Sequence, residues 1–554
     1  ISAGEETAER IAATLGIEPD SEYRLNAGVK FALADATAVA GHCDLPRPEL
    51  ALSARRMLGN DPDLIDRTID SLILSHEISA QVLPGDDGED VVALYQPSTY
   101  RAESEVARRL REMIDAMPDT MATDLSAQID ELERVEGIAF HAQQRQAIET
   151  AVTSGMTVIT GGPGKGKTTI IKCIIKLLSV HGDIALAAPT GRAAKRMSEL
   201  TGRSAQTIHR LLEAGMSDDH QDIAFRRDED DPLECDAVIL DECSMVDISL
   251  MCALLRAMRP ECRLILVGDA DQLPSVGPGN VFSDIIRSGV IPTVRLTEIF
   301  RQAAGSSIVA YAHAINRGEH PNLAQNSGDF FFLRRTDPQK AADTVVELCK
   351  TRLPNNMKIP PSDIQVLTPT RKYDTGMAAL NVRLQAALNP PTDGKKERRF
   401  GEIIFREGDR VMQIRNDYDI VLKNPDGTTA GTGVYNGDVG QITAIDPQTE
   451  TLAVCYDGKT ATYGFEMLNE LEHAWVMTVH KSQGSEYRAV VLCIGRAGPM
   501  LLTRSVLYTA ITRAKSLLIV VGDEGAAYHM IDNQAQTRRY SGLRARLCGE
   551  CGEA

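Results

Sequence analysis

Short apolar runs separated by amphipathic segments fill the chain from about residue 139 onward. A run of this kind with helical spacing on either side is typical of a strand in a parallel sheet that helices cover on both faces. The runs form two groups, which are Thr157–Thr160, Ile184–Ala188, Ala237–Leu240 and Leu264–Val267, and then Ile364–Thr368, Ala489–Ile494 and Leu517–Val521. The pattern therefore predicts an α/β protein with two parallel sheets.

The first hundred residues have apolar positions three and four residues apart, which is helical spacing. The elements predicted up to residue 136 are helices at Glu6–Leu15, Leu50–Leu58, Pro62–Leu74 and Glu103–Met117, a short strand at Val91–Tyr95, and a polar connector at Asp119–Glu136. We expect a small N-terminal helical domain over residues 1–137, of the winged-helix or helix-bundle type.

Residues 396–470 interrupt the second sheet domain with a different pattern. Gly401–Arg415 and Gly433–Tyr463 hold short alternating strands, with turns predicted at Asn424-Pro425-Asp426-Gly427 and at Asn436-Gly437. Such hairpins favour a small inserted β-barrel. The first sheet domain is then expected at 138–325, and the second at 326–395 and 471–554, ending in a C-terminal tail.

The composition is that of an ordinary globular protein, with 554 residues, 43% of them hydrophobic and 25% charged. No apolar run reaches the roughly 18 residues that a membrane-spanning helix needs. The chain begins Ile1-Ser2-Ala3, without Met or a signal pattern, so we interpret it as a fragment with further sequence upstream. Its 11 cysteines are scattered singly, which favours reduced thiols and a cytoplasmic protein.

One close cysteine pair, Cys548 and Cys551, lies near the C-terminus. A zinc site needs a second such pair or suitably spaced histidines, and the sequence has neither nearby. The alternatives are a metal site or a mobile tail.

The formal net charge of −18 argues mildly against nucleic acid as a partner, because phosphate binding draws on Lys and Arg. Net charge is a global sum, however, and a local basic groove is enough to bind a strand. The charge alone does not exclude nucleic acid.

Residues 161–168 carry the strongest chemical signal, between the predicted strand Thr157–Thr160 and the helix-like Ile170–Leu178. Glycines let backbone N–H groups approach phosphate oxygens, and the helix N-terminus adds favourable partial charge. This loop predicts a nucleoside triphosphate site in which Lys167 neutralises the β- and γ-phosphates and Thr168 ligates magnesium. The residues expected to hold the nucleotide here are Gly162, Pro163, Gly164, Lys165, Gly166, Lys167, Thr168 and Thr169.

Two adjacent carboxylates, Asp241 and Glu242, follow the apolar strand Ala237–Leu240. An apolar strand that ends in two acids suits the second half of a phosphate-loop site. We expect Asp241 to hold the magnesium ion and Glu242 to polarise the attacking water.

Two arginines are candidates for meeting the charge that develops on the γ-phosphate during transfer. Arg301 lies in Leu296-Thr297-Glu298-Ile299-Phe300-Arg301-Gln302, and Arg513 lies in Tyr508-Thr509-Ala510-Ile511-Thr512-Arg513-Ala514-Lys515. A single arginine is more often a surface ion-pair partner, so this role depends on the motifs around it.

Those motifs resemble, in order, the motifs of superfamily 1 helicases and in detail those of the RecD family. The segments that carry the resemblance are Phe140-His141-Ala142-Gln143-Gln144, Ala188-Pro189-Thr190-Gly191-Arg192-Ala193-Ala194, Thr207-Ile208-His209-Arg210-Leu211, Gly268-Asp269-Ala270-Asp271-Gln272-Leu273-Pro274-Ser275-Val276, and Val476-Met477-Thr478-Val479-His480-Lys481-Ser482-Gln483-Gly484-Ser485-Glu486. The two arginine segments correspond to motifs IV and VI. The match extends from Phe140 to Lys515.

The resemblance is greatest to the stand-alone, longer RecD-like proteins. Val434-Tyr435-Asn436-Gly437-Asp438 is similar to their SH3-like insertion, and Arg24–Leu33 to their helical region before the motor. Lys165 departs from the family, which usually has a small polar residue there.

The resemblance implies two RecA-like domains with ATP and Mg²⁺ in the cleft between them. It adds Gln144 as the adenine reader, Gln272 as the γ-phosphate sensor and Glu486 as a further nucleotide contact, and it supports Arg301 and Arg513 as catalytic cations. Closing and opening of this cleft would couple hydrolysis to domain movement.

Single-stranded DNA would run across both domains, held by backbone groups and hydroxyls that do not read sequence. The residues expected to contact it are Pro189, Thr190, Arg192, His209, Arg371, Arg415, Thr478 and His480, with Lys372 as a further candidate.

The acidic segment near residues 213–235 is predicted to form a small protrusion on the first sheet domain. Asp218, Asp219 and Asp228 are among its acids, with Arg226 and Arg227 as its bases. A pin that splits the duplex and a solvated loop are equally compatible with this composition.

The sequence as a whole predicts a monomeric ATP-dependent DNA helicase that moves 5′→3′ on single-stranded DNA and opens duplex junctions, with the polarity implied only by the resemblance. Three alternatives stay open, namely a DNA-stimulated translocase without strand separation, a P-loop ATPase that gates a protein partner, and a non-catalytic scaffold.

Overall fold

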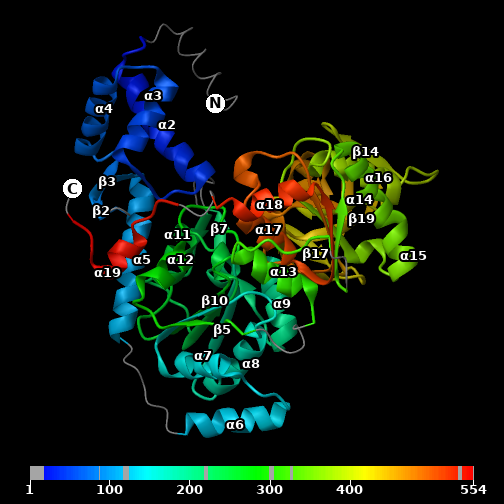
Figure 1. The fold of residues 1–554 in the computed structure, drawn as a ribbon, viewed down its shortest axis with the longest axis horizontal. Helices are drawn as coiled ribbons and strands as arrows, with labels where there is room; N and C mark the ends of the chain where they lie inside the picture. Colours follow the sequence, from blue (N-terminus) through cyan, green and yellow to red (C-terminus); the bar gives the residue numbers. More distant parts are fainter. Residues whose placement is uncertain are drawn as a thin grey trace.

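The computed structural model describes residues 18–85, 88–116, 124–216, 223–298, 305–324, 328–534 and 539–552. Figure 1 shows the N-terminal domain at the upper left above the first sheet domain, with the second sheet domain and its insertion at the right. None of the helices in these ranges combines the length and apolar character that a membrane crossing requires.

From residue 18 to residue 95, the N-terminal domain combines three helices with a three-stranded antiparallel sheet of order β1-β3-β2. The helix predicted at Glu6–Leu15 lies outside the described residues. The elements of the domain are α2 (Glu22–Ala40), β1 (Asp44–Pro46), α3 (Arg47–Leu58), α4 (Pro62–Leu74), β2 (Ser79–Pro84) and β3 (Asp90–Tyr95). This succession is that of a winged helix and not of a pure helix bundle. Leu50, Ile65 and Leu94 pack in its core.

Two helices connect this domain to the first sheet. The first, α5 (Pro97–Ala116), is followed by α6 (Leu125–Glu136), where the sequence predicted only a polar connector. That prediction was wrong because Leu125 and Ile129 form a narrow apolar stripe, four residues apart, that is buried. They join the core that contains α7 (Ala142–Thr153).

The first sheet domain holds a six-stranded parallel sheet of order β11-β4-β10-β9-β5-β6. Its strands are β4 (Met156–Thr160), β5 (Ile184–Ala188), β6 (Gln206–Thr207), β9 (Ala237–Leu240), β10 (Arg263–Gly268) and β11 (Thr293–Arg295). Its other helices are α8 (Lys167–Leu178), α9 (Gly191–Thr201), α10 (Ile208–Leu211), η1 (Cys243–Met245), α11 (Ile248–Arg256) and α12 (Val281–Ser288). Strands β4 and β9 are buried at every position, as expected for a sheet covered on both faces.

The second sheet domain holds a five-stranded parallel sheet of order β12-β25-β24-β13-β23. Its strands are β12 (Phe330–Arg334), β13 (Ile364–Thr368), β23 (Val476–Thr478), β24 (Tyr487–Ile494) and β25 (Ala514–Gly522). Its helices are α13 (Ser307–Asn316), α14 (Pro338–Glu347), η2 (Leu348–Arg352), α15 (Leu353–Met357), η3 (Pro361–Asp363), α16 (Met377–Leu388), η5 (His480–Ser482), η6 (Pro499–Leu501), α17 (Arg504–Ile511) and α18 (Glu524–Asp532). The predicted boundary at residue 325 differs from this arrangement, because Ile308 and Ala312 of α13 pack in the core of the second domain.

The insertion is antiparallel and lies between α16 and β23. Its main sheet has the order β18-β17-β21-β20-β19-β16-β22, with β14 and β15 paired beside it. The elements are β14 (Glu397–Phe400), β15 (Ile403–Arg406), β16 (Arg410–Gln413), β17 (Asp417–Lys423), β18 (Thr429–Val434), β19 (Val439–Asp446), β20 (Thr451–Tyr456), β21 (Lys459–Gly464), η4 (Phe465–Glu470) and β22 (Leu471–His473). The fold class predicted from the sequence, two RecA-like sheets with an inserted β-rich domain and N-terminal helices, is confirmed.

A two-stranded hairpin, β7 (Ala214–Met216) and β8 (Ile223–Phe225), leaves the first sheet domain where a protrusion was predicted. The residues between these strands, including Asp218 and Asp219, lie outside the described ranges.

The C-terminal segment, residues 539–552, returns to the N-terminal half of the molecule. Its helix α19 (Leu543–Cys548) packs against α5 and α12, as the red ribbon beside α5 shows in Figure 1. The interpretation of this end as a mobile tail was therefore wrong. Within the described ranges, no cluster of three or more His, Cys, Asp or Glu side chains is placed to bind a metal ion, and Cys548 is exposed.

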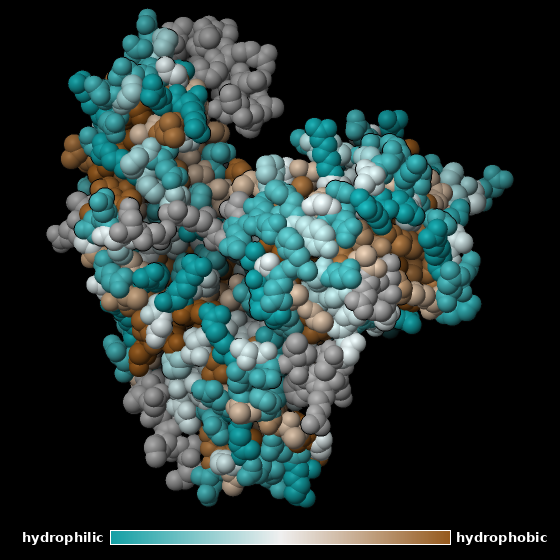
Figure 2. Space-filling view, viewed as in Figure 1, coloured by the Kyte–Doolittle hydropathy of each residue, from teal (hydrophilic) through white to brown (hydrophobic). Residues whose placement is uncertain are grey.

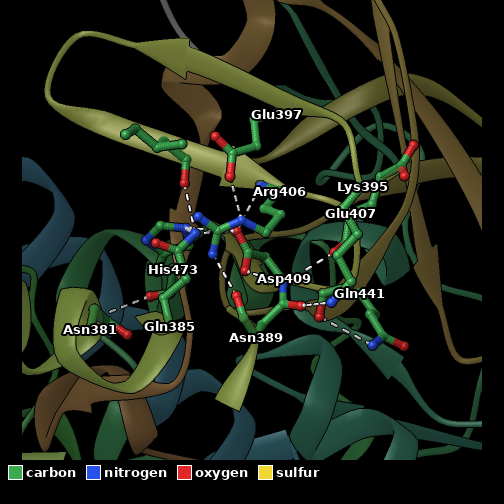
Figure 3. Close-up of polar contacts among 12 residues, drawn as sticks. Asn381, Gln385, Asn389, Lys395, Glu397, Arg406, Glu407, Asp409, Gln441 and His473 are labelled. Carbon is green, nitrogen blue, oxygen red and sulfur yellow. Dashed lines mark hydrogen bonds and ion pairs between the residues drawn. The ribbon is translucent and has the colours of Figure 1, made fainter. Parts of the chain in front are cut away.

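Buried polar side chains join the insertion to the second sheet domain (Figure 3). The fully buried Asp409 carboxylate accepts hydrogen bonds from Gln385 Nε2 (2.6 Å), Asn389 Nδ2 (2.7 Å) and the Arg406 backbone N–H (2.7 Å). His473 Nε2 lies 3.2 Å from the same carboxylate. Gln385 belongs to α16, and Asn389 follows its C-terminal end. Asp409 directly precedes β16 and His473 ends β22, so the carboxylate connects both of these strands of the insertion to the helix.

Replacing Asp409 with Ala is expected to leave these donors buried without an acceptor, at a cost of about 3–5 kcal/mol in unfolding free energy. Asp419→Ala, at an exposed position of the same insertion, is the control and should cost under about 0.5 kcal/mol. Denaturant unfolding followed by limited proteolysis of the insertion measures the difference. Equal midpoints for the two variants would show that the network does not hold the insertion.

Candidate nucleotide and nucleic-acid site

The phosphate loop connects β4, a central strand of the first sheet, to the N-terminus of α8. Gly164 and Gly166 have φ angles of 72° and 76°. Glycine adopts this left-handed region without steric cost, and the bend turns backbone N–H groups toward the start of the helix. The predicted loop therefore has the strand–loop–helix setting of a phosphate cradle.

Gly162 lies at a close approach of the two sheet domains. A Cβ atom at this position would stand 2.6 Å from the hydroxyl of Tyr508, a residue of α17 in the second sheet domain. The Tyr508 hydroxyl donates to Asp269 Oδ2 at 2.9 Å, and both side chains are buried. Glycine is thus required here because the opposing domain occupies the space of a side chain.

Lys167 turns its ammonium group back over the loop. Lys167 Nζ donates to the carbonyl oxygens of Gly161 (2.5 Å) and Gly268 (3.4 Å). An ammonium group held between two carbonyls above a phosphate cradle can exchange them for phosphate oxygens. Beside it, burial lowers the pKa of Lys165, against the opposing effect of Asp269 and Asp271.

A cavity of about 230 Å³ lies between the two sheet domains at this loop. Its lining from the first domain is residues 162–168 with Ile171, Arg196, Met197, Leu200, Thr201, Asp241, Glu242 and Gln272, and from the second domain Glu486, Thr512 and Arg513. A second cavity of about 1020 Å³ shares Pro163, Gly164, Gly166, Glu486 and Thr512 with it and extends past Phe140 and Thr169. The predicted residues of the phosphate loop, with Asp241, Glu242, Gln272, Glu486 and Arg513, therefore line a cavity that both domains share.

Asp241 and Glu242 end β9 inside this cavity. Burial, with repulsion from Glu242, raises the pKa of Asp241 to about 6, while Lys167 acts in the opposite direction. Glu242 has a φ of 55°, a strained value for a residue with a side chain, and its N–H donates to Asp241 Oδ1 at 2.8 Å. Carboxylates and the Thr168 hydroxyl are hard oxygen donors of the kind that Mg²⁺ prefers, and two protein ligands with substrate phosphates are its usual set.

Gln272 contributes a buried amide with one free atom. Its Nε2 donates to Asp269 Oδ2 at 3.2 Å, whereas its Oε1 has no hydrogen-bond partner within the described part of the protein. A buried acceptor without a partner costs free energy, so its position at the cavity wall suits a ligand or water that donates to it.

Gln144 is buried and lies behind the loop. Its Nε2 donates to the Lys165 carbonyl at 3.1 Å, and its Oε1 accepts from the His141 N–H at 3.0 Å, which caps α7. In this structure the amide expected to read adenine thus fixes the phosphate loop to α7. Arg301, the other predicted contact on this side, lies outside the described residues.

Arg513 is buried at the wall that the second domain contributes. Its guanidinium donates to the carbonyls of Thr509 and Ser485 (both 3.1 Å) and to Thr512 Oγ1 (3.3 Å). These partners belong to its own domain, so the side chain is held across the cleft from the phosphate loop.

Glu486 makes ion pairs on both sides of the cleft. Its carboxylate lies 2.7 Å from Arg196 of the first domain and 3.6 Å from Lys515 of the second. Sequence reasoning missed Arg196, because an arginine on an amphipathic helix carries no signal that it faces a cavity. It also gave no role to Asp269 or Tyr508, although both lie inside recognised motifs.

The predicted DNA contacts from the two sheets come together at the carboxyl ends of their strands. Thr190 caps α9 by accepting from the Ala193 N–H at 3.3 Å, and Thr478 ends β23. A Cβ atom on Gly484 would stand 2.8 Å from Thr190 Oγ1, so the segments after Pro189 and after Thr478 meet across the domain boundary.

Two of the charged candidates have partners in the structure, and one of these, Arg371, is exposed as well. Arg192 Nη1 donates to Ser485 Oγ (3.0 Å) and Tyr487 Oη (2.7 Å), and Arg371 pairs with Glu472. Arg415 and Lys372 are exposed.

The two histidines differ from these cations because burial lowers the pKa of both His209 and His480. Both imidazoles are therefore neutral at pH 7 and suit stacking better than phosphate neutralisation. Val276, in the loop after Gln272, has 74% of its surface exposed, and this apolar tip was not singled out from the sequence.

Sequence profiles of three domain families match the chain. An AAA domain matches residues 144–278, the SH3 domain of ATP-dependent RecD-like DNA helicases matches 380–456, and a UvrD-like helicase C-terminal domain matches 473–521. The two sheets and the insertion thus each contain a matched region.

Two relatives align over nearly the whole chain. The ATP-dependent RecD2 DNA helicase of Deinococcus radiodurans is 32% identical, over 94% of this chain and 68% of its own. The RecBCD enzyme subunit RecD of Mycolicibacterium smegmatis is 30% identical, over 98% of this chain and 96% of its own. A solved structure of Bacteroides Pif1 helicase with ADP-AlF3 and single-stranded DNA covers 71% of this chain and 94% of its own, at 18% identity and a TM-score of 0.42.

A methyl group at position 162 is expected to force Tyr508 away from Asp269. Gly162→Ala should therefore lower the unfolding free energy by about 1–3 kcal/mol, the usual cost of overpacking. Combining it with Tyr508→Phe, which removes the clashing hydroxyl, should recover part of that loss. The measurement is a double-mutant cycle on unfolding midpoints, with Gly305→Ala, where no atom lies within 4 Å of a built Cβ, as the control. Strict additivity of the two changes would contradict the contact.

Proposed function

The chain belongs to the RecD-like family of superfamily 1 DNA helicases, and on this basis we propose that it hydrolyses ATP to move 5′→3′ along single-stranded DNA and to separate the duplex ahead of it. The direction of movement rests on the resemblance to the RecD family. The remaining steps are argued from the site itself.

One observation carries the proposal, namely that a single cavity is lined by the phosphate loop of one sheet domain and by Glu486, Thr512 and Arg513 of the other. A nucleotide bound there contacts both domains at once. Its γ-phosphate is present before hydrolysis and absent after it, so the two nucleotide states favour different separations of the domains. Differential affinity of this kind is what a motor requires.

Within the first domain, the phosphate loop, Asp241, Glu242 and Gln272 line this cavity. Lys167 neutralises the β- and γ-phosphates, and Glu242 orients the attacking water. Gln272 Oε1, which has no partner within the described residues, accepts a hydrogen bond from that water beside the γ-phosphate. Asp241 and Thr168 hold Mg²⁺, which supplies positive charge to the phosphates. Because the pKa of Asp241 is about 6, protons compete with that cation below this pH.

From the second domain, Arg513 supplies the cation that meets charge developing on the transferred phosphoryl group. It must exchange its bonds to Thr509 and Ser485 for phosphate oxygens, so we assign the present structure to a state before that engagement. Glu486 leaves Arg196 in the same step to contact the nucleotide.

Single-stranded DNA lies over the carboxyl ends of both sheets, where Thr190 and Thr478 offer hydroxyls and backbone N–H groups to phosphates. His209 and His480 stack against bases, and the exposed Val276 packs between them. Arg371 and Arg415 contact the backbone at the second domain.

The β7–β8 hairpin is proposed as the element that separates the strands. A cavity of about 570 Å³ lies between its base and the insertion. Its lining includes Arg210 and Arg227, the aromatic rings of Tyr418 and Tyr435, and the acids Glu234 and Glu213, of which Glu213 pairs with Arg227 at 2.8 Å. Cations beside aromatic rings suit a nucleotide leaving the duplex.

Arg513→Ala is expected to retain nucleotide binding and to lower ATP turnover on the order of 10³-fold, because it removes charge stabilisation in the transition state. Fluorescent-nucleotide titration and steady-state hydrolysis measure the two effects separately. Arg488→Ala is the matched control, since Arg488 is an exposed arginine that pairs with Asp363 away from the cleft. Turnover of Arg513→Ala equal to that of the control would contradict the proposed role.

The whole proposal is tested by ATP-dependent strand displacement on two partial duplexes, one with a 5′ single-stranded tail and one with a 3′ tail. Opening of the 5′-tailed duplex alone is the expected result, and Lys167→Ala should abolish it.

Opening of the 3′-tailed duplex alone would contradict the polarity while leaving the helicase activity in place. If neither duplex opens although DNA stimulates ATP hydrolysis, the protein is a translocase. A rate of ATP hydrolysis that does not change when DNA is added would favour an ATPase that gates a protein partner.

A further inference from the structure

The C-terminal segment makes backbone contacts with the N-terminal domain on its return path. The Tyr540 carbonyl accepts from the Cys43 N–H at 2.9 Å, and the Tyr540 N–H donates to His42 Nδ1 at 3.0 Å. Farther along, the Gly552 N–H donates to the Val82 carbonyl at 3.2 Å. The segment therefore belongs structurally to the N-terminal half, although it follows the last motif of the second sheet domain.

Arg539, the first described residue of this segment, is bonded to a single loop. Its Nη1 donates to the carbonyls of Gly277 (2.7 Å) and Gly279 (2.8 Å) and to Ser275 Oγ (3.3 Å), and its Nη2 donates to the Ser275 carbonyl (2.7 Å). One guanidinium thus donates hydrogen bonds to three backbone carbonyls of residues 275–279. Burial lowers the pKa of Arg539, but a guanidinium stays charged at physiological pH.

The 275–279 loop begins three residues after Gln272, and its two ends are held by different domains. At the near end, the Leu273 N–H donates to Thr509 Oγ1 (3.0 Å) and Gln483 Nε2 donates to the Leu273 carbonyl (2.9 Å), both from the second sheet domain. At the far end, the Gly279 N–H donates to the Gly41 carbonyl of the N-terminal domain at 2.9 Å.

Within the loop itself, the Ser275 hydroxyl donates to the Gly277 carbonyl (3.0 Å) and lies 3.4 Å from the Gly279 carbonyl. The loop sequence, Ser275-Val276-Gly277-Pro278-Gly279, contains two glycines and forms no helix or strand. Three carbonyls that converge repel one another unless a cation or donors stand between them. The planar fork of an arginine supplies several donors in fixed directions, which a lysine cannot reproduce. Arg539 therefore holds three of the loop's carbonyls, while the Ile248 N–H of α11 donates to a fourth, that of Pro278, at 3.0 Å.

We propose that Arg539 is a positioning residue for ATP hydrolysis, because it holds the 275–279 loop and, through it, the Gln272 amide at the cavity wall. The inference rests on the proposed function of Gln272. It makes the C-terminal segment and the N-terminal domain part of the apparatus that sets the turnover rate, although neither touches the nucleotide.

A purely anchoring role for Arg539 is a poorer account, because other residues already attach the segment. The buried Glu103 carboxylate accepts hydrogen bonds from Arg546 Nε (3.2 Å) and the Gly542 N–H (3.1 Å). Arg111 Nη2 donates to the Leu547 carbonyl (2.8 Å). These contacts reach α5 and leave the 275–279 loop untouched. They also provide a matched control, since Arg111→Ala weakens docking of the segment without altering the loop.

The test compares Arg539→Ala, Arg539→Lys and Arg111→Ala in the full chain. Hydrogen exchange of the peptide that spans Gln272–Gly279 should rise in Arg539→Ala and stay unchanged in Arg111→Ala. At saturating single-stranded DNA, Arg539→Ala should lower kcat by about 10- to 100-fold, as small displacements of a reacting geometry do, with the KM for ATP within about threefold. Arg539→Lys should lie between Arg539→Ala and the unaltered chain, and Arg111→Ala within about twofold of the latter.

If kcat falls equally in Arg539→Ala and Arg111→Ala, in proportion to the fall in their melting temperatures, Arg539 only attaches the C-terminal segment and the proposal is overturned. A loss confined to the Kd for single-stranded DNA would instead make Arg539 a DNA contact and overturn it as well. If the unaltered chain hydrolyses no ATP, the proposed function fails. The exchange experiment then still decides whether Arg539 holds the loop.

Discussion

Asp269 is the buried charge around which the two sheet domains meet. Its carboxylate accepts from Tyr508 of the second domain and from Gln272 of the first, and it is fully buried beside the phosphate loop. The domains can approach this closely only because Gly162 has no side chain in the path of Tyr508. Lys167 on one wall and Arg513 on the other face the same small cavity as a consequence. A nucleotide site divided in this way is sensitive to any change in domain separation.

The insertion and the N-terminal domain are attached to this core by contacts of unequal strength. Buried hydrogen bonds around Asp409 hold the insertion against α16. The contacts of the insertion with the first sheet domain include the ion pair of Lys195 and Asp457 (2.6 Å), in which both side chains are substantially exposed. Exposed pairs contribute about 0–1 kcal/mol, so the insertion is expected to move with the second domain. The C-terminal segment contacts the N-terminal domain at His42, and its Arg539 binds the 275–279 loop of the first sheet domain. The motif that contains Gln272 therefore contacts the second sheet domain at one end and the N-terminal domain at the other.

Chemistry encoded in consecutive residues was predictable, because a strand, a glycine loop and a helix start are local features. Residues 162–168 and the Asp241–Glu242 pair were assigned from the sequence, and in the structure they line one cavity. What escaped prediction depends on partners far apart in the chain. The engagement of Gln144 with Lys165, the contact of Tyr508 with Asp269 and the bonds of Arg539 to residues 275–279 leave no periodic signal. Helix α6 was missed for a related reason, since a mostly polar helix with two buried positions differs little from a connector.

The central claim is that DNA binding and hydrolysis at the divided site are linked. The most direct measurement is steady-state ATP hydrolysis by the full chain as single-stranded DNA is added at fixed, saturating Mg²⁺-ATP. The account predicts that the rate rises with DNA to a plateau, by on the order of 10-fold or more, the scale of a coupling free energy between linked sites. A rate that is substantial without DNA and does not change when DNA is added would contradict it.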